Sequence, residues 1–211
     1  MNLRLALFAL LATACASSDD KSTDGTTDGT TASESTTDGT TDGTTDADDG
    51  MFVEDAADGL SVASVNPERY LGVWYEIAST PSPQQALCAG TTAEYSLRED
   101  GDVRVINRCY LGSLEGDLNV IEGSASFVDD TYARLLVDFN LGFEAPYNIV
   151  ELDGQEGDAP YEFAVVSSPG FALWVLSRTP TMDAELYDTL LRRATDRGLP
   201  ADTLIETVQA D

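Results

Sequence analysis

From about residue 61 to the C-terminus, short stretches of alternating apolar and polar residues are separated by turn-forming residues. Alternation places every second side chain on the same face, as expected for strands with one buried face. Turn signals such as Arg98-Glu99-Asp100-Gly101-Asp102 and Ser168-Pro169-Gly170 separate neighbouring stretches. Eight strands are predicted, at 71–78, 91–97, 103–109, 118–127, 132–139, 147–152, 161–167 and 171–177. This spacing predicts an all-β domain, either an up-and-down barrel or a sandwich.

After the last of these strands the pattern changes to a helical period over 181–197. Apolar residues three and four positions apart form one stripe, which consists of Tyr187, Leu190, Leu191 and Ala194. Gly198 and Pro200 end the predicted helix. A short final strand is predicted at 204–208. The folded domain is therefore expected to span 61–211.

The first 14 residues are predicted to be an export signal. Arg4 and the amino terminus are positive, Leu5–Leu11 is apolar, and Ala12-Thr13-Ala14 offers small residues for cleavage. The apolar run is too short to span a bilayer. Ala-Thr-Ala-Cys resembles the lipobox of bacterial lipoproteins, which predicts lipidation of Cys15 and an outer-membrane location. Ordinary cleavage is the alternative, and it would leave a periplasmic or extracellular protein.

Residues 15–60 form an acidic segment rich in Thr, Asp and Gly. The tetrapeptide Asp-Gly-Thr-Thr begins at Asp24, Asp28, Asp38 and Asp42. Such a composition offers almost no apolar surface to bury and predicts disorder. We interpret the segment as a tether between the membrane anchor and the folded domain.

The charge balance limits the possible partners. The chain has 38 acidic and 11 basic residues, no His, and a formal net charge of −27. No nucleic-acid partner is expected, because phosphate binding needs clustered Lys and Arg. The lack of His excludes Ser-His and Cys-His nucleophile pairs and His-based metal sites. No catalytic residue, metal or cofactor is predicted.

Three segments resemble the signature motifs of the lipocalin family. Asn66–Ala78 contains Gly72-x-Trp74 and is similar to the first motif of bacterial outer-membrane lipoprotein lipocalins and their apolipoprotein D relatives. Tyr147–Asp153 is similar to the second motif, and Leu173–Pro180 closely resembles the third. The resemblance covers Asn66 to Val208. It implies an eight-stranded antiparallel up-and-down barrel with one C-terminal α-helix and a short ninth strand.

The resemblance also implies structural roles for five residues. In lipocalins the Arg of the third motif, here Arg178, stacks on the Trp of the first, here Trp74, and with Gly72 closes the barrel floor. Related bacterial lipocalins have cysteines at similar positions to Cys88 and Cys109. An exported chain favours disulfides, and lipid on Cys15 would leave these two to pair. A catalytic thiol is the competing interpretation.

Alternation with Trp74 as the inward reference predicts which side chains line a ligand pocket. Glu76, Tyr95 and Tyr147 are its expected polar groups, although Glu76 has a structural role as its alternative. A register slip of one residue would move each of these side chains to the outer face. The expected ligand-binding residues are Glu76, Tyr95, Val105, Phe127, Leu135, Val137, Tyr147, Ile149, Phe163 and Trp174.

These features predict a membrane-tethered binding protein. An eight-stranded barrel can hold one small ligand, and the expected partner is a fatty acid, a lysophospholipid or a similar apolar molecule. The expected role of such a protein is the storage or transport of lipid, or maintenance of the cell envelope. One alternative is an interaction or structural protein of the envelope whose barrel is filled by its own side chains. The other is a lipid-modifying enzyme on the same barrel. The sequence specifies no oligomeric state.

Overall fold

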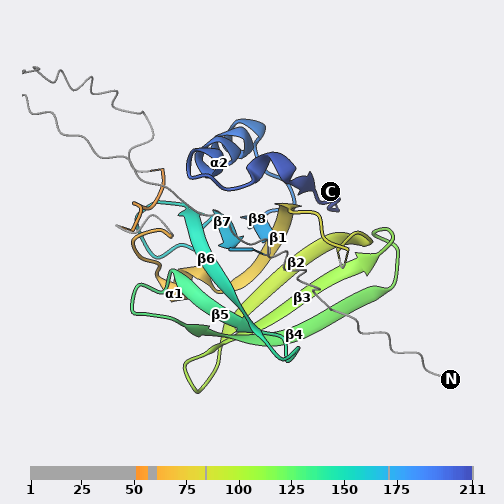
Figure 1. Cartoon of the computed structure of the whole chain (residues 1–211), viewed down its shortest axis with the longest axis horizontal. Helices are drawn as coiled ribbons and strands as arrows, with labels where there is room; N and C mark the ends of the chain where they lie inside the picture. Colours follow the sequence, from red (N-terminus) through yellow and green to blue (C-terminus); the bar gives the residue numbers. More distant parts are fainter. Residues whose placement is uncertain (1–50, 57–60, 84, 171, 211) are drawn as a thin grey trace, which may run out of the picture. The chain divides into compact units, whose positions relative to one another are not determined.

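The structure is a computed structural model, and it describes residues 51–56, 61–83, 85–170 and 172–210 (Figure 1). The predicted signal peptide, Cys15 and most of the tether lie outside these residues. Within them, helix α1 precedes eight strands, and helix α2, a short 3-10 turn and a final strand follow. The strands are β1 (Gly72–Ser79), β2 (Cys88–Leu97), β3 (Val103–Leu111), β4 (Leu118–Phe127), β5 (Arg134–Asp138), β6 (Glu144–Leu152), β7 (Phe163–Ser168) and β8 (Ala172–Ser177).

The eight strands close into one antiparallel barrel, which confirms the predicted fold. Neighbouring strands in the sequence pair in order from β2 to β8, and β1 pairs with both β8 and β2. Because the barrel is closed, each of the eight strands is paired with a neighbouring strand on both sides. The remaining elements are α1 (Pro67–Tyr70), α2 (Ala184–Asp196), η1 (Ala201–Thr203) and β9 (Ile205–Glu206).

Helix α2 lies against the outside of the barrel (Figure 1). Its N-cap is Asp183, whose side chain accepts from the amides of Glu185 and Leu186. The buried side of the helix carries Leu190 and Ala194, as the helical period predicted. These side chains pack with outward-facing residues of β7 and β8, so a second apolar cluster forms between helix and barrel.

Two short segments are attached to the barrel near its ends. Phe52 forms a bridge with Asp153, and the amide of Val53 donates to the carbonyl of Leu152 at 3.0 Å. Residues 51–56, which the sequence analysis assigned to the tether, therefore pair with the barrel. At the other terminus β9 pairs with β1, and the amide of Gly90 in β2 donates to the carbonyl of Val208 at 2.7 Å.

The closed end of the barrel is built around Arg178, as the family resemblance implied. Its guanidinium carbon lies 3.8 Å from the ring centroid of Trp74, which is fully buried. Arg178 Nη2 donates to the carbonyls of Arg69, Tyr70 and Leu71, at the end of α1. A Cβ on Gly72 would lie 3.5 Å from Arg178 Nη1, which is an ordinary contact, so it is the φ of +96° that favours glycine here.

The open end carries a disulfide between the first residue of β2 and the last part of β3. Cys88 and Cys109 are bonded, with their Cα atoms 5.3 Å apart. This confirms the expected pairing. Since both sulfurs are in the bond, the competing catalytic thiol is absent from these two positions.

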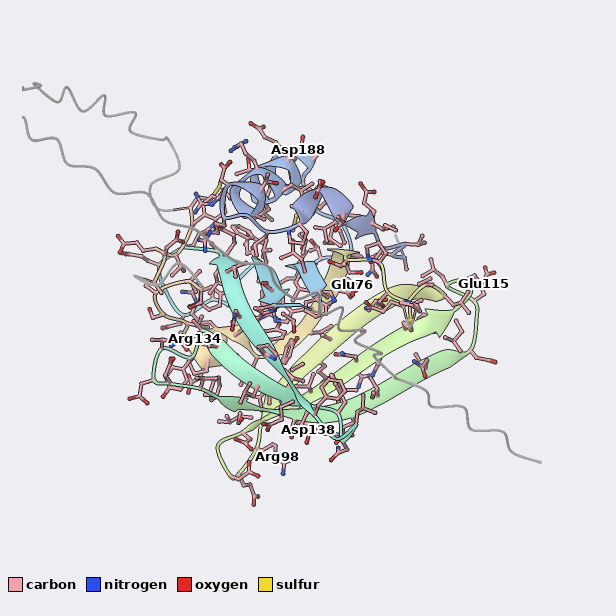
Figure 2. All side chains as sticks on the ribbon, viewed as in Figure 1. Glu76, Arg98, Glu115, Arg134, Asp138 and Asp188 are labelled. Atoms are coloured by element: carbon pink, nitrogen blue, oxygen red, sulfur yellow. A yellow bond between two sulfur atoms is a disulfide. The ribbon has the colours of Figure 1, made fainter. Side chains whose placement is uncertain are left out.

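None of the helices in the described part of the chain is both long enough and apolar enough to cross a bilayer. The charged side chains labelled in Figure 2, such as Arg98, Glu115 and Asp188, lie on the outside of the barrel and helix. Glu76 is the exception, being only 6% exposed.

Removal of the disulfide should destabilise the domain. The bond closes a loop with a sequence separation of 21 residues. The chain-entropy account gives about 3 kcal/mol for a loop of this size. We therefore expect the Cys88→Ser/Cys109→Ser variant to lose that amount in the free energy of unfolding, measured in urea. The wild-type protein under reductant is the control and should match the variant. An unchanged midpoint in both would contradict the prediction.

Arg178→Ala should also lower stability. The substitution removes a stacked cation, worth about 1–2 kcal/mol when partly desolvated, and leaves several carbonyls without a donor. We expect a lower melting temperature by circular dichroism. Arg178→Lys keeps the charge but not the planar guanidinium with its several donors. Its melting temperature should therefore lie between those of the wild type and Arg178→Ala. A melting temperature equal to wild type in Arg178→Ala would show that the floor does not depend on this side chain.

Candidate functional site

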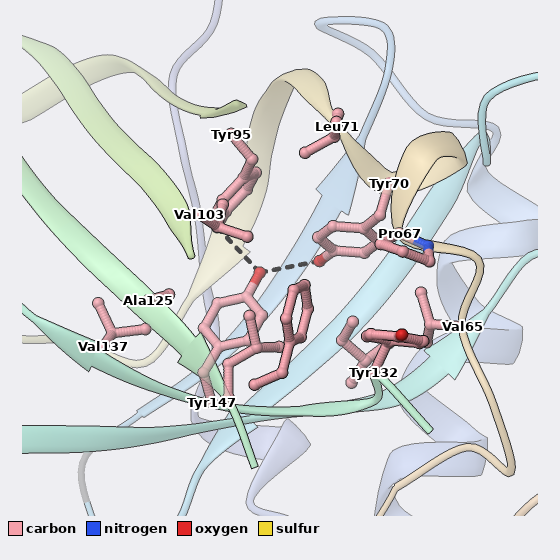
Figure 3. Close-up of a pocket in the computed structure, with 13 residues that line it drawn as sticks. Val65, Pro67, Tyr70, Leu71, Tyr95, Val103, Ala125, Tyr132, Val137 and Tyr147 are labelled. Carbon is pink, nitrogen blue, oxygen red and sulfur yellow. Dashed lines mark hydrogen bonds between the residues drawn. The ribbon is translucent and has the colours of Figure 1, made fainter. Parts of the chain in front are cut away.

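A cavity lies inside the barrel at the end covered by α1 (Figure 3). The cavity has a volume of about 20 Å³. Side chains therefore fill most of the interior at this level. The lining residues are Val65, Pro67, Tyr70, Leu71, Tyr95, Val103, Ala125, Phe127, Tyr132, Leu135, Val137, Tyr147 and Ile149.

Alternation placed several expected pocket residues on the correct face. The antiparallel register pairs Ala125 with Val137 and Phe127 with Leu135, so these four share one face of β4 and β5. Six of the ten residues expected from the sequence line this cavity: Tyr95, Phe127, Leu135, Val137, Tyr147 and Ile149.

Five lining residues come from outside the predicted strand interiors. Val65 precedes α1, Pro67 and Tyr70 are its first and last residues, and Leu71 follows it. Tyr132 lies in the turn between β4 and β5 with a φ of 58°. Sequence reasoning missed them because alternation applies only within strands. The sequence did carry a signal for the residues at α1, namely the apolar residues just before the Gly-x-Trp motif. In the structure these residues cover the closed end of the barrel.

Phe163 was expected in the cavity, and the structure contradicts this. It is buried in the outer cluster with residues of α2. Its neighbours in β7 are all buried as well, because the helix covers one face of this strand and the barrel interior the other. A strand buried on both sides has no apolar–polar alternation to fix its faces, so the assignment from sequence was wrong.

Two further expected residues face the interior without lining the cavity. Val105 belongs to the interior cluster, and Trp174 is partly buried against that cluster. Val166 of β7, the partner of Trp174, also belongs to it. These positions fill the barrel beside the cavity. The sequence analysis correctly placed both side chains on the inward face of their strands. Its expectation that they line the cavity was wrong.

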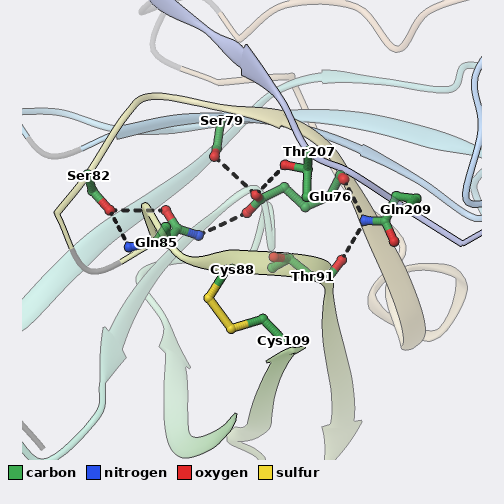
Figure 4. Close-up of a disulfide and its surroundings, with 9 residues drawn as sticks. All are labelled: Glu76, Ser79, Ser82, Gln85, Cys88, Thr91, Cys109, Thr207 and Gln209. Atoms are coloured by element: carbon green, nitrogen blue, oxygen red, sulfur yellow. Dashed lines mark hydrogen bonds between the residues drawn. A yellow bond between two sulfur atoms is a disulfide. The ribbon is translucent and has the colours of Figure 1, made fainter. Parts of the chain in front are cut away.

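Glu76 does not line the cavity and instead binds the C-terminal segment (Figure 4). Its carboxylate accepts from Ser79 Oγ at 3.0 Å, Gln85 Nε2 at 3.0 Å and Thr207 Oγ1 at 2.6 Å. Gln209 Nε2 also donates to the backbone carbonyl of Glu76 at 2.8 Å. Burial raises the pKa of Glu76, and the three donors oppose that shift. The structural alternative is therefore correct for this residue.

Three of the tyrosines that line the cavity bring their hydroxyls together (Figure 3). Tyr147 Oη lies 2.8 Å from Tyr70 Oη and 2.9 Å from Tyr95 Oη, so it is the centre of a hydrogen-bonded trio. Tyr70 comes from α1, Tyr95 from β2 and Tyr147 from β6. We call Tyr70, Tyr95 and Tyr147 the tyrosine trio.

Tyr70 and Tyr95 are buried, Tyr147 is partly buried, and all three hydroxyls are protonated at neutral pH. Burial raises the pKa of Tyr95 to about 12, and it raises the pKa values of Tyr70 and Tyr147 well above the ordinary value. Ring contacts fix the geometry, since the centroid of Tyr70 lies 4.9 Å from Trp74 and 5.6 Å from Tyr95. The trio thus presents neutral hydroxyls held by the barrel floor.

Arg178 contributes positive charge beneath the trio. Its hydrogen bonds go to backbone carbonyls, and no carboxylate of the described residues forms an ion pair with it. Burial lowers its pKa to about 10, so it remains a cation at neutral pH. Its charge also lowers the pKa values of Tyr70 and Tyr95, against the larger effect of burial.

The other half of the interior carries polar atoms of a different kind. Thr91 Oγ1, Asn107 Oδ1 and Ser168 Oγ are buried and have no hydrogen-bond partner among the described residues. Asn107 pairs with inward-facing Ala93, and Ser168 continues the inward face of Val166. No group of three or more potential metal ligands is found in the described part of the chain.

Comparisons with known proteins agree with this geometry. A lipocalin-like domain model matches residues 65–209. The chain is 38% identical over 146 residues to the outer membrane lipoprotein Blc of Escherichia coli K12, covering 68% of this chain and 79% of that one. Temperature-induced lipocalin-1 of Arabidopsis thaliana is 36% identical over 158 residues, covering 71% and 82%.

Solved structures show the same fold at greater sequence distance. Lobster apocrustacyanin A1 superposes with a TM-score of 0.54 at 21% identity, covering 69% of this chain and 81% of that one. The matched family model, the relatives and the closed barrel with its Trp74–Arg178 floor lead to one conclusion. The chain belongs to the lipocalin family.

Proposed function

We propose that this lipocalin binds one small apolar or amphipathic ligand, of the fatty acid or lysophospholipid class, for lipid storage, transport or envelope maintenance. The observation that carries the proposal is the cavity inside a closed barrel, whose walls are apolar and include the rings of three tyrosines with mutually bonded hydroxyls. Small-molecule sites commonly combine these two features. Membership in a family with outer membrane lipoproteins supports action in the cell envelope.

A filled barrel that acts through its outer surface is the second candidate. The observation in its favour is the small volume of the cavity, about 20 Å³. That is enough for about one or two waters. Under the first proposal, flexible side chains on the cavity wall, such as Phe127, move when an apolar chain enters. Under the second they stay in place.

We infer binding without turnover. The chain has no His, and Cys88 and Cys109 are bonded to each other. The trio phenols have raised pKa values, so they are poor nucleophiles and bases at neutral pH. Function rests on the site and not on the fold, and this site offers hydrogen bonding and apolar contact.

We also propose that Cys15 carries a lipid anchor and that the acidic segment after it is a tether. The motif before Cys15 and the outer membrane lipoproteins among the relatives support this proposal. Acyl chains anchor a protein because each buried methylene contributes about 0.8 kcal/mol. The domain would then act at a membrane surface.

Filling the cavity should abolish ligand binding. Ala125 lines the cavity and is 2% exposed, so Ala125→Phe places a ring where the ligand chain would lie. We expect at least about a tenfold loss of affinity, the equivalent of 1.4 kcal/mol. The measurement is displacement of a fluorescent fatty acid from the full chain carrying Cys15→Ser, with native mass spectrometry to detect the adduct.

Ser126→Phe is the matched control, because Ser126 neighbours Ala125 but lies on the opposite face of β4. It should bind as the parent chain does. Should the parent chain itself take up no lipid and displace no probe, the ligand-binding proposal is wrong and the filled barrel replaces it.

Loss of the anchor should release the protein from the membrane. We expect Cys15→Ser to shift the exported chain from the membrane fraction to the soluble fraction, and to lose incorporation of a clickable fatty acid. Cys88→Ser/Cys109→Ser leaves Cys15 intact and should remain membrane-bound. Equal fractionation of Cys15→Ser and the parent chain would rule out an acyl anchor at this position.

A further inference from the structure

The ladder between β1 and β2 covers only part of the two strands. In the described part of the chain it runs from the closed end to the pair formed by Tyr75 and Thr92. Beyond that pair β1 continues along β8, with a register shift between Glu76 and Ala78. The residues of β2 that precede Thr92 pair with β3. A seam is therefore left near the open end, between the last residues of β1 and the first residues of β2.

The C-terminal segment fills this seam, and we call residues 205–209 the strap. On one side β9 pairs with β1, and the amide of Thr207 donates to the carbonyl of Ile77 at 2.8 Å. On the other side the amide of Gly90 in β2 donates to the carbonyl of Val208 at 2.7 Å. The strap thus takes the place of the missing part of the ladder.

Two side chains of the strap reinforce this bridge (Figure 4). Gln209 Nε2 donates to the carbonyls of Glu76 and Thr91, at 2.8 and 2.9 Å, so one side-chain amide joins β1 to β2. Thr207 Oγ1 donates to the carboxyl of Glu76 at 2.6 Å. Gln85, in the loop before β2, donates to the same carboxyl at 3.0 Å. Hydrogen bonds of the strap and of this loop therefore close the seam.

The strap is attached by hydrogen bonds more than by apolar contact. Ile205 and Val208 are 59% and 63% exposed, and neither belongs to an apolar cluster of the described residues. Leu204, just before the strap, is packed against the cluster under α2. Segments with few buried apolar contacts open at a smaller cost in free energy than the core. The strap is therefore expected to detach while Leu204 stays in place.

The closed seam also leaves buried polar atoms without partners. Thr91, whose carbonyl binds Gln209, is 8% exposed, and its Oγ1 has no hydrogen-bond partner among the described residues. The same holds for Oδ1 of Asn107, whose strand neighbour Ala93 packs against the interior cluster. A buried polar atom without a partner is costly. Opening the seam exposes Thr91 to water, which lowers the cost of detaching the strap.

From the seam, the weak apolar attachment and the unsatisfied Thr91, we propose that residues 205–209 detach and rebind as a unit. The opened seam is then a lateral entrance to the barrel interior, between β1 and β2. Detachment is a property of the fold by itself. Its use as an entrance rests on the proposed ligand-binding function and adds the route by which an apolar molecule passes the barrel wall.

Detachment can be measured by hydrogen exchange at single amides, followed by NMR on the full chain carrying Cys15→Ser. The amides of Gly90 and Thr207 donate on opposite sides of the strap, so detachment frees both in one step. We expect the same opening free energy at both amides, and a lower one than in the β3–β4 ladder. Different values at the two amides, or values as high as those in that ladder, would overturn the inference.

The side-chain attachment is tested by Thr207→Val, which keeps the shape of the side chain and removes its bond to Glu76. We expect exchange at Gly90 to become about tenfold faster, as for the loss of one buried hydrogen bond. Thr203→Val is the matched control, because the Thr203 hydroxyl donates to the carbonyl of Pro200, outside the strap. It should leave exchange at Gly90 unchanged. Equal effects of the two substitutions, or no effect of Thr207→Val, would contradict this attachment.

The entrance is tested by locking the strap with Ala78→Cys/Glu206→Cys. The two residues face each other in the β1–β9 pair, next to the hydrogen-bonded pair of Thr207 and Ile77. They therefore form a non-hydrogen-bonded pair, whose usual Cα separation of about 4.5 Å suits a disulfide. We expect the fluorescent fatty acid cis-parinaric acid to associate and dissociate at least about tenfold more slowly, at unchanged affinity, because a gate changes rates and not the equilibrium. Ala78→Ser/Glu206→Ser is the control without the bond and should match the parent chain.

A chain that ends after Leu204 lacks the strap and should show the opposite effect, with both rates at least about tenfold faster. If this shortened chain fails to fold, the locked chain still decides the route. Equal rates in the parent and locked chains would show that ligands enter elsewhere and would overturn the lateral entrance. A parent chain that takes up no probe would overturn the proposed ligand binding and the entrance with it, and hydrogen exchange would still decide whether the strap detaches.

Discussion

The contact between Arg178 and Trp74 is the one on which the rest of the interior depends. The guanidinium stacks on the indole and donates to the three carbonyls at the end of α1. One side chain thereby joins β8's C-terminal end to the start of β1 and holds α1 across the barrel. Tyr70 is part of α1, so its position against Trp74 and in the trio follows from this contact. The floor is thus a structural feature with a direct effect on the cavity.

The sequence predicted strand faces well where one face of a strand meets solvent. Leu135 and Val137 alternate with less buried neighbours along β5, Phe127 follows polar Ser126 in β4, and all three line the cavity. Phe163 could not be placed in this way, because α2 covers the outer face of β7 and removes the alternation. Glu76 was misplaced for a different reason: its partner Thr207 lies 131 residues away, and no local pattern encodes that contact.

The same distinction explains why only two of the three trio residues could be predicted from the sequence. Tyr95 and Tyr147 stand at inward positions of strands, and alternation predicted both. Tyr70 precedes the first strand, and it joins them only because α1 is folded across the barrel end. The two hydrogen bonds exist only when the closed floor brings all three hydroxyls together. A property of this kind belongs to the assembled floor, and we expect ligand preference in this barrel to depend on how α1 is held as much as on the strand residues that line the wall.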